Sequence, residues 1–335
     1  MKVARAGTVS FLRWLMIASV ALPFVLFAYA SWLNYHATYR AADERIDRSL
    51  TIVQENAVNV FDSAELLIAG ANTVAAGLTD DQIRLREPEI HEQLAALTKP
   101  LKGTQAVWLF AADGSPLVSS DIFPMPRNFV NTDRDYFRAH VERDAGLYVG
   151  AVVPPKVPGK EIFVAARRRP GAQFRGVTAV AIRPSNTEAF YRAIGSAPGS
   201  YYALIREDGA FLARYPEPTE RGLKLNSAST TMKSIAANPE AGINSLTSQT
   251  DTVKRRLGYR KVPKYPVYAL AAVDEQVILD QWLATMASHL VFGVPATAFI
   301  LSALYFGLLR TRRLHQEAEA RENAEATLRL SLIHI

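Results

Sequence analysis

The sequence predicts an α+β protein in which two similar modules, each an antiparallel sheet with flanking helices, lie on a long helix between two transmembrane helices. Three observations predict this arrangement. Two apolar stretches of about 20 residues enclose the middle of the chain, an apolar pattern of period 3.5 follows the first stretch, and a hairpin-like pattern occurs twice further on. Of the 335 residues, about 250 lie between the spans, enough for two compact modules of roughly 100 residues each.

Residues 14–33 and 287–309 are the predicted transmembrane helices. Each is close to the ~20 residues that cross a ~30 Å hydrocarbon core, and neither contains Lys, Arg, Asp or Glu, whose burial in a membrane is costly. Basic residues flank the two spans on the sides facing away from the enclosed region: Lys2, Arg5, Arg13, Arg310, Arg312 and Arg313. By the positive-inside rule, we expect both termini, including the tail 1–13, in the cytoplasm and the enclosed region outside. A cleaved signal peptide is the alternative for the first span, because Ala28-Tyr29-Ala30 resembles a cleavage site.

The composition excludes several classes of function. The net charge of +6 comes largely from the membrane flanks, and no basic run forms a nucleic-acid-binding motif, so we expect no nucleic-acid partner. The chain has no cysteine, which excludes disulfides, Cys-based metal sites and a Cys nucleophile. Its six histidines are scattered without metal-ligand spacing, and no nucleophile-elbow pattern occurs. We therefore predict no catalytic residue, no metal site and no cofactor in this chain.

The segment 34–74 is the predicted long signalling helix. Its apolar residues follow a 4-3-4-3 spacing, the 3.5-residue period of a coiled coil over about four heptads. They are Ile46, Leu50, Val53, Ala57, Val60, Ala64, Leu67, Ala71 and Val74. Two compatible interpretations remain open: the stripe packs on its own domain, or its first half also forms the seam of a homodimer.

Residues 75–183 are predicted to form the membrane-distal module and residues 184–282 the membrane-proximal one. In the first, an apolar strand is followed by the turn Asp113-Gly114 and a second apolar strand, and the same order recurs around Asp208-Gly209. Further strands are predicted at residues 150–153, 161–167, 174–182, 244–249, 255–261 and 267–273, with 154–160 as a turn.

Three short motifs in this order resemble a known family. They are Asp133-Arg134-Asp135-Tyr136-Phe137-Arg138, Phe163-Val164-Ala165-Ala166-Arg167-Arg168, and Asp208-Gly209 with Leu212-Ala213-Arg214-Tyr215-Pro216. A long helix and two PAS-like modules between two spans, over about residues 35–285, resemble the double Cache sensor domain of bacterial receptors. The resemblance implies a periplasmic sensor that binds a small molecule in its distal module, and a two-pass protein of the bacterial inner membrane.

The resemblance also implies the location of the ligand. Arg134, Tyr136 and Phe137 would line or abut the pocket, with Arg offering a planar fork to a carboxylate and the aromatic rings giving rigid walls. Trp108 and Ser120 lie on strands that should face the same cleft. Arg167 or Arg168 could add a second cation, although alternation along a strand lets only one of them point inward. The alternative is that Tyr136 and Phe137 are core residues and that Arg134 pairs with a neighbouring Asp.

The sequence departs from the amino-acid-binding subgroup of this family at the two aromatic positions and at one position on a later strand. In that subgroup, the pocket motif is Arg-x-Trp-Tyr. An Asp on the strand that ends the distal module binds the ammonium of the ligand. Here Tyr136 and Phe137 stand at the aromatic positions and Ala181 stands where the Asp is expected. The carboxylate half of the site is present and the ammonium half is missing, so a small organic anion is favoured over an amino acid.

The C-terminal segment predicts the type of output. Residues 310–329 are charged, rich in Ala and Glu and free of Gly and Pro, which predicts a cytoplasmic coiled-coil linker continuing the second span. The part 321–329 resembles the helix before the phosphoacceptor helix of membrane histidine kinases. Residues 330–335 match the translation of a transposon end used in DNA library preparation, so we expect this hexapeptide to be an artefact and the output domain to follow in the native protein.

The expected whole protein is therefore a sensor histidine kinase. Its missing output domain would use ATP and Mg²⁺ and act on a response regulator, and the receptor would be a homodimer. The alternatives are a diguanylate cyclase or phosphodiesterase with the same sensor, or a chemoreceptor. The module that chemoreceptors place after the second span requires a Pro in its first helix, and no Pro occurs between Arg310 and Ile335.

Overall fold

The computed structural model describes residues 2–101, 105–195, 197–218 and 222–333. The described residues fall into two compact units. One consists of residues 2–40 and 278–333, and the other of residues 41–277. Two long helices contribute to both: α1 (Lys2–Val74) near the N-terminus and α7 (Glu275–Ile333) near the C-terminus.

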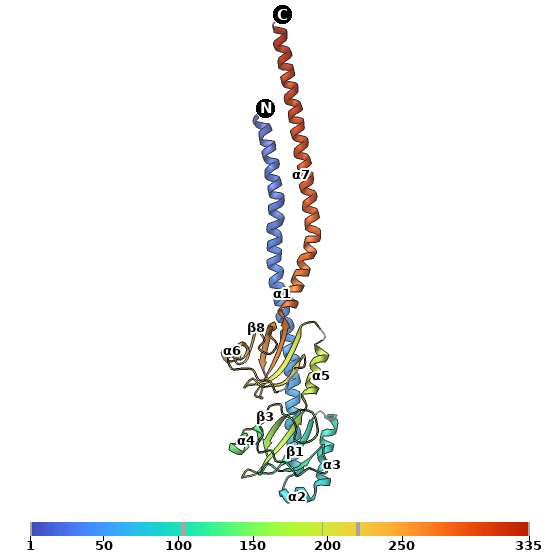
Figure 1. The fold of residues 1–335 in the computed structure, drawn as a ribbon, viewed down its shortest axis with the longest axis vertical. Helices are drawn as coiled ribbons and strands as arrows, with labels where there is room; N and C mark the ends of the chain where they lie inside the picture. The colour runs from blue at the N-terminus through green and yellow to red at the C-terminus, as the bar shows by residue number, and fades with distance from the viewer. Residues whose placement is uncertain (1, 102–104, 196, 219–221, 334–335) are drawn as a thin grey trace. The chain divides into compact units, whose positions relative to one another are not determined.

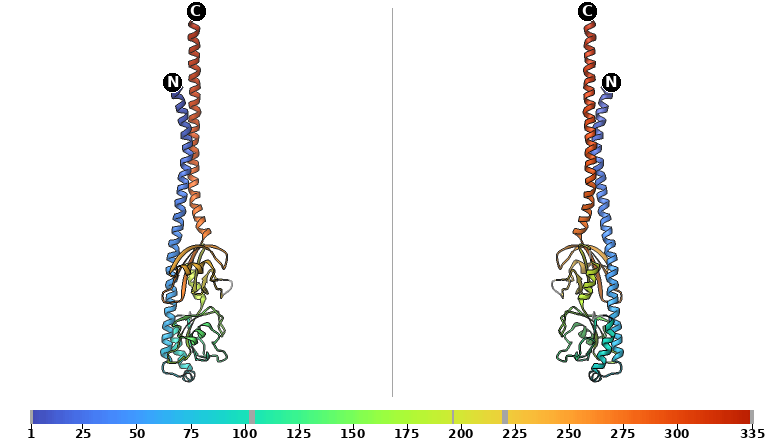
Figure 2. Two further views of the ribbon diagram at one scale, coloured as in Figure 1. Left: turned by 90° about the vertical axis from the view of Figure 1, so that its left-hand side faces the viewer. Right: turned by 90° about the vertical axis from the view of Figure 1, so that its right-hand side faces the viewer.

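The first unit is a pair of helices, parts of α1 and α7, that lie side by side (Figure 2). The indole Nε1 of Trp282 donates to the carbonyl of Ser31 at 3.2 Å, and its ring meets the ring of Tyr35 edge-on at 5.8 Å. Each helix has an apolar stretch long enough to cross a membrane, and large side chains there, such as Phe24 and Phe292, are exposed. The predicted linker 310–329 lies within α7, and the last two residues of the predicted artefact 330–335 lie outside the described residues.

The distal module is a five-stranded antiparallel sheet with the order β2-β1-β5-β4-β3. Its strands are β1 (Gln105–Phe110), β2 (Pro116–Ser119), β3 (Tyr148–Val149), β4 (Phe163–Arg168) and β5 (Val177–Ile182). Its helices are α2 (Asp80–Leu85), α3 (Glu87–Thr98), the 3₁₀ helix η1 (Lys99–Leu101) and α4 (Asp135–Glu142). The β1–β2 hairpin turns at Gly114, whose φ of +80° suits glycine.

The proximal module repeats this plan with the order β7-β6-β10-β9-β8. Its strands are β6 (Ser200–Arg206), β7 (Phe211–Tyr215), β8 (Ala241–Thr247), β9 (Lys254–Lys261) and β10 (Val267–Asp274), and its helices are α5 (Pro184–Ile194) and α6 (Thr230–Ala237). The two leading hairpins even share a register shift near the end of their first strand, at Leu109/Phe110 and Leu204/Ile205. The predicted α+β fold of two repeated antiparallel modules is confirmed. Helix α7 begins at Glu275, directly after β10, so residues 275–282 of the predicted proximal range are helical.

Helix α1 packs along both sheets in its second half (Figure 1 and Figure 2). Phe61 is fully buried and its ring contacts Phe163 of the distal module at 6.3 Å and Tyr265 of the proximal module at 5.0 Å. Gly258 of β9 lies so close that a Cβ there would come within 2.6 Å of Ile46, which explains a glycine inside a strand. Most of the predicted heptad stripe is buried: Ile46, Leu50, Val53, Ala57, Ala64, Leu67 and Ala71. The stripe therefore packs on its own modules, as the first of the two interpretations proposed.

The segment 150–162 differs from the prediction. It is not a hairpin of strands 150–153 and 161–167, because β3 ends at Val149 and β4 begins only at Phe163. A single bridge joins Val153 to Ile162. Gly150 still donates to the Val164 carbonyl at 2.7 Å, and Val153 exchanges both backbone bonds with Ile162, so the pairing continues past β3 with one extra residue on its strand. The N–H of Ala151, in this bulge, points away from β4 and donates to Asp135 Oδ2 at 3.0 Å. The bulge opens a long loop that stands beside the sheet.

Candidate ligand-binding site

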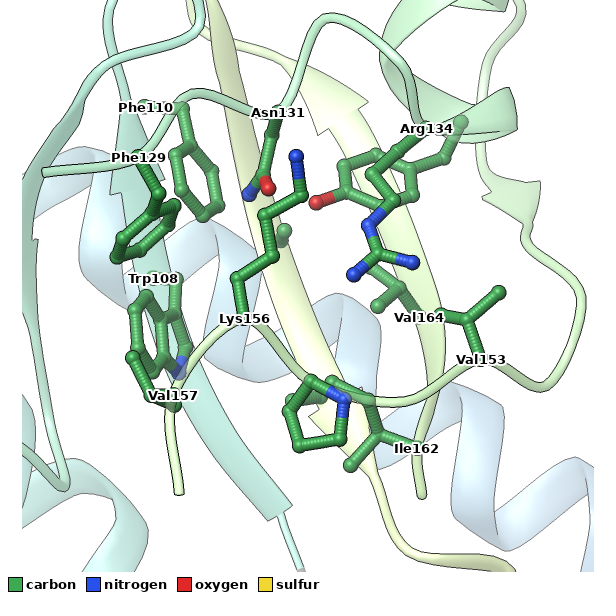
Figure 3. A pocket seen from close by; sticks show the side chains of 14 residues that line it. Trp108, Phe110, Phe129, Asn131, Arg134, Val153, Lys156, Val157, Ile162 and Val164 are labelled. Carbon is green, nitrogen blue, oxygen red and sulfur yellow. The ribbon is translucent and has the colours of Figure 1, made fainter. Parts of the chain in front are cut away.

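A cavity of about 450 Å³, counting its open mouth, lies in the distal module between one face of the sheet and the loops before α4 and β4 (Figure 3). The residues that line it are Trp108, Phe110, Phe129, Asn131, Arg134, Tyr136, Val153, Pro155, Lys156, Val157, Ile162, Val164, Ala179 and Ala181.

One side of the cavity is an aromatic wall. The two-residue period of β1 places Trp108 and Phe110 on the same face, where their rings stack at 6.0 Å and 13°. Phe129, from the loop before α4, adds a third ring at 6.4 Å from Trp108. Figure 3 shows these three side chains together, on the opposite side of the cavity from Arg134. Rigid rings of this kind bury the apolar part of a ligand at a low entropic cost.

Two cationic side chains reach the cavity. Arg134 stands at the N-cap position of α4, and its guanidinium donates to the carbonyl of Pro154 at 2.7 Å. Lys156 comes from the long loop and extends between the aromatic wall and Arg134 (Figure 3), with its ammonium bonded to the Val130 carbonyl and to Asp133. The hydrogen bond from Lys156 lowers the pKa of Asp133. None of the lining residues is an Asp or Glu. Asp133 offsets the charge of Lys156, so Arg134 is the main positive charge at the cavity wall, where it favours an anion.

Two neutral polar side chains complete the lining. Tyr136 and Asn131 are both nearly buried, at 4% and 5% exposed. Burial raises the pKa of the Tyr136 hydroxyl, so this group stays protonated and able to donate a hydrogen bond. The Asn131 amide supplies both a donor and an acceptor. One end of the cavity, at Arg134, can therefore bind a carboxylate, and the other end, at the aromatic wall, can bind the apolar part of the same ligand.

The structure brings together three of the six residues proposed from the sequence. Trp108, Arg134 and Tyr136 line the cavity. Phe137 does not, because it faces the core, is 1% exposed and packs edge-on against Phe174. The hydroxyl of Ser120 also lies elsewhere, accepting from the backbone N–H of Val107 at 3.0 Å to extend the β1–β2 pairing.

The second cation is Lys156, and neither Arg167 nor Arg168 reaches the cavity. Alternation along β4 turns Arg167 to the other face of the sheet, where it pairs with Glu65 of α1. Arg168 is on the cavity side, but its Nε donates to the carbonyl of His140 at the end of α4 at 2.6 Å.

Lys156 and Phe129, the main residues that the sequence did not indicate, lie in loops. A signal existed for Lys156, since a long Pro-rich loop in a compact module is commonly functional. The local pattern around Phe129 gives no such signal.

Ala181 of β5 lines the cavity, which is the place where the resemblance expects the ammonium-binding Asp. A wider hollow of about 740 Å³, counting open space, adjoins the cavity and shares Trp108 and Ala181 with it. Asp121 lines this outer hollow, and burial raises the pKa of its carboxyl. Among the residues that the structure describes, no group of three or more His, Cys, Asp or Glu side chains is placed to hold a metal ion.

No protein-family model and no curated protein sequence matches the chain. Solved structures do. The extracellular domain of rpHK1S-Z16, assigned as a histidine kinase, is 25% identical with a TM-score of 0.59, covering 72% of this chain and 98% of that one. The ligand-binding domain of the Campylobacter jejuni chemoreceptor Tlp3 with L-norvaline is 12% identical with a TM-score of 0.51, covering 72% and 94%. That of the Pseudomonas fluorescens chemoreceptor CtaA with L-leucine is 18% identical with a TM-score of 0.51, covering 73% and 99%.

These neighbours are sensor domains of receptors, and the chain spans nearly their whole length. The region 41–277 has their two-module fold, the double Cache fold that the motifs indicated. With two helices apolar enough to cross a membrane, the chain is a membrane protein with an extracellular sensor domain.

Proposed function

We propose that this chain is the sensory and membrane-spanning part of a bacterial receptor, and that its distal module binds a small organic anion. The protein crosses the inner membrane twice, holds its sensor in the periplasm and has both termini in the cytoplasm. The charge pattern at the ends of the two spans supports this orientation.

The observation that carries the proposal is the asymmetric lining of the distal cavity. Arg134 and Lys156 supply two positive charges at one side, and Trp108 with its neighbouring rings supplies an apolar wall at the other. A ligand with one carboxylate and a compact apolar body satisfies both. Ligand and loop would then share the Lys156 ammonium, which now bonds to Val130 and Asp133.

The neighbouring chemoreceptors were solved with L-norvaline and L-leucine, which carry an ammonium group as well. This chain has Ala181 on the cavity wall and no acidic residue among the lining residues. An ammonium placed there would lose its hydration without gaining a carboxylate partner among the lining residues, which is costly. We therefore assign the site to carboxylates that lack an α-amino group.

The output that fits best is a histidine kinase acting on a response regulator. Helix α7 runs without interruption to Ile333, which supports a direct helical linker after the second span. The extracellular domain of a histidine kinase also has the highest identity among the neighbours described above. A chemoreceptor or a cyclic-dinucleotide enzyme is the alternative. We propose a homodimer, since the outward face of α1 carries the exposed apolar residues Ile52 and Leu66.

The experiment is a thermal-shift screen of the purified chain in nanodiscs against matched triplets: a carboxylic acid, its amide and its α-amino acid. One such triplet is 4-methylpentanoate, 4-methylpentanamide and leucine. We expect at least one carboxylate to raise the melting temperature, while its amide and amino acid do not. A panel in which only amino acids stabilise the chain would refute the assignment to amine-free acids.

A further inference from the structure

Arg206 belongs to the proximal module but reaches into the distal one. It is the last residue of β6, and its NH1 donates to Asp135 Oδ2 at 2.7 Å and to the Val149 carbonyl at 3.1 Å. Its side chain is 15% exposed, so the contact is largely shielded from water. An ion pair in such a setting is screened less by salt than a surface pair.

Asp135 is the residue between Arg134 and Tyr136, two residues that line the cavity. Its Oδ1 accepts from the backbone N–H of Tyr136 at 2.7 Å, and its Oδ2 accepts from the backbone N–H of Ala151 at 3.0 Å. One carboxylate thus binds the start of α4, the long loop and Arg206. The first two are the segments that carry the two cations of the site.

Arg206 is itself fixed by its own module. Asp208 accepts from its Nε and NH2, both at 3.0 Å, and Asp208 also accepts from Lys224 at 2.7 Å. On the distal side, the guanidinium lies 5.7 Å from the ring centre of Tyr148 of β3. Burial by itself would lower the pKa of Arg206, but its bonds to Asp208 and Asp135 outweigh burial and raise it. The proximal module therefore holds the guanidinium through Asp208, independently of its bond to Asp135.

We infer that Arg206 is a positioning residue for the distal ligand site: through Asp135 it holds the start of α4 and the loop 150–157 at the spacing that places Arg134 and Lys156 on one anion. The distal site is then completed by the proximal module. Coupling in the opposite direction also follows. A ligand that draws these two segments together would alter the contact between Asp135 and Arg206, and so would act on β6 of the proximal module. Its role toward an anion rests on the proposed function, whereas its role in holding the loop does not.

The test uses the full chain in nanodiscs. The chain has four tryptophans, Trp14, Trp32, Trp108 and Trp282. Replacing all but Trp108 by Phe leaves one fluorophore, which lines the cavity. Variants Arg206→Gln, Asp135→Asn and the double variant are compared with Arg260→Gln. Arg260 is a matched control because it is an arginine of the same module, paired with Asp47 of α1 and away from the cavity.

Two readouts are measured: acrylamide quenching of Trp108, and the Kd for 4-methylpentanoate. We expect Arg206→Gln to raise the quenching constant at least two-fold and the Kd at least ten-fold. The double variant should be no worse than the more damaging single variant, since both single changes break the Arg206–Asp135 contact. Arg260→Gln should change neither readout by more than two-fold.

The inference is overturned if Arg206→Gln leaves Trp108 quenching unchanged, if Arg260→Gln has an equal effect, or if the two single effects multiply in the double variant. The outcome is separable from that of the proposed function. If 4-methylpentanoate and the rest of the acid panel fail to bind the parent chain while Arg206→Gln still exposes Trp108, the positioning role stands and the assignment to carboxylates fails.

Discussion

Removing the guanidinium of Arg134 is the sharpest test of the anion site. In Arg134→Ala the ligand carboxylate would lose a charge-assisted partner, while the protein loses only the bond to the Pro154 carbonyl at 2.7 Å. Truncating one partner of a shielded charge pair costs about 2–5 kcal/mol of binding free energy. At about 1.4 kcal/mol per factor of ten, the Kd should rise at least ~30-fold.

The same numbers predict the thermal shift. A ligand present at about 100 times its Kd stabilises the folded state by ~2.7 kcal/mol. For a unit the size of residues 41–277, each kcal/mol is worth roughly 2–4 °C, so the parent chain should gain about 5–11 °C. With a 30-fold weaker Kd at the same concentration, Arg134→Ala should gain only ~2–3 °C.

The assay is differential scanning fluorimetry with the carboxylate identified in the screen. Arg138→Ala is the matched control, because Arg138 lies on the same helix and is exposed away from the cavity. The melting temperature without ligand should change little in either variant. The reasoning is refuted if Arg134→Ala keeps the full ligand shift, or if Arg138→Ala loses as much of it.

Three further predictions follow from the structure. Ala181→Asp should turn preference toward the α-amino acid of each triplet, because it adds an acceptor for the ammonium at the cavity wall; Ala181→Asn is the uncharged control, and an unchanged order of affinities would contradict the model of the pocket. Phe61→Ala should lower the free energy of unfolding by about 3–5 kcal/mol, since it opens a void between both modules, whereas truncating the exposed Leu66 should cost under ~1 kcal/mol in denaturant titrations; equal effects would show that Phe61 is not a shared core residue. Burial alone would raise the pKa of Asp251, but its hydrogen bonds with Arg255 and Ser248 outweigh burial and lower it to about 2. Its stabilising contribution is therefore present above pH ~4 and lost as the pH falls toward 2, so Asp251→Asn should be less stable than the parent at pH 7 and should approach it in acid. A stability difference that does not depend on pH would contradict this assignment.

The fold was predictable because its signals are periodic. The two spans, the heptad stripe and the repeated Asp-Gly hairpins each show a local spacing that only one kind of element satisfies. The structure keeps all three, with Gly114 and Gly209 at positive φ in equivalent turns. The prediction was least accurate where the register of a strand shifts. Residues 150–153 have strand composition and pair back at Gly150 and Val153, but an extra residue between them breaks the regular ladder, and Asp135 accepts from the outward N–H of Ala151.

The site was predictable only in part, for a related reason. Arg134 and Tyr136 belong to a contiguous motif, and Trp108 follows from the alternation of side chains along β1. All three could therefore be predicted from the sequence alone. Lys156 lies in a loop without periodicity, and Arg167 and Arg168 look equivalent in the sequence. The partners that the fold provides, Glu65 for Arg167 and the His140 carbonyl for Arg168, decide that neither reaches the cavity.

The sequence by itself determined what depends on neighbouring residues: two apolar helices, the helix that carries the modules, and the order of strands in each repeat. Only the tertiary structure decided which oppositely charged side chains form ion pairs. Arg206 and Asp135 are 71 positions apart, and no local pattern pairs them. A hydrogen bond acts only within about 3 Å, so which of the many Arg and Asp residues form one is set by packing of the two modules.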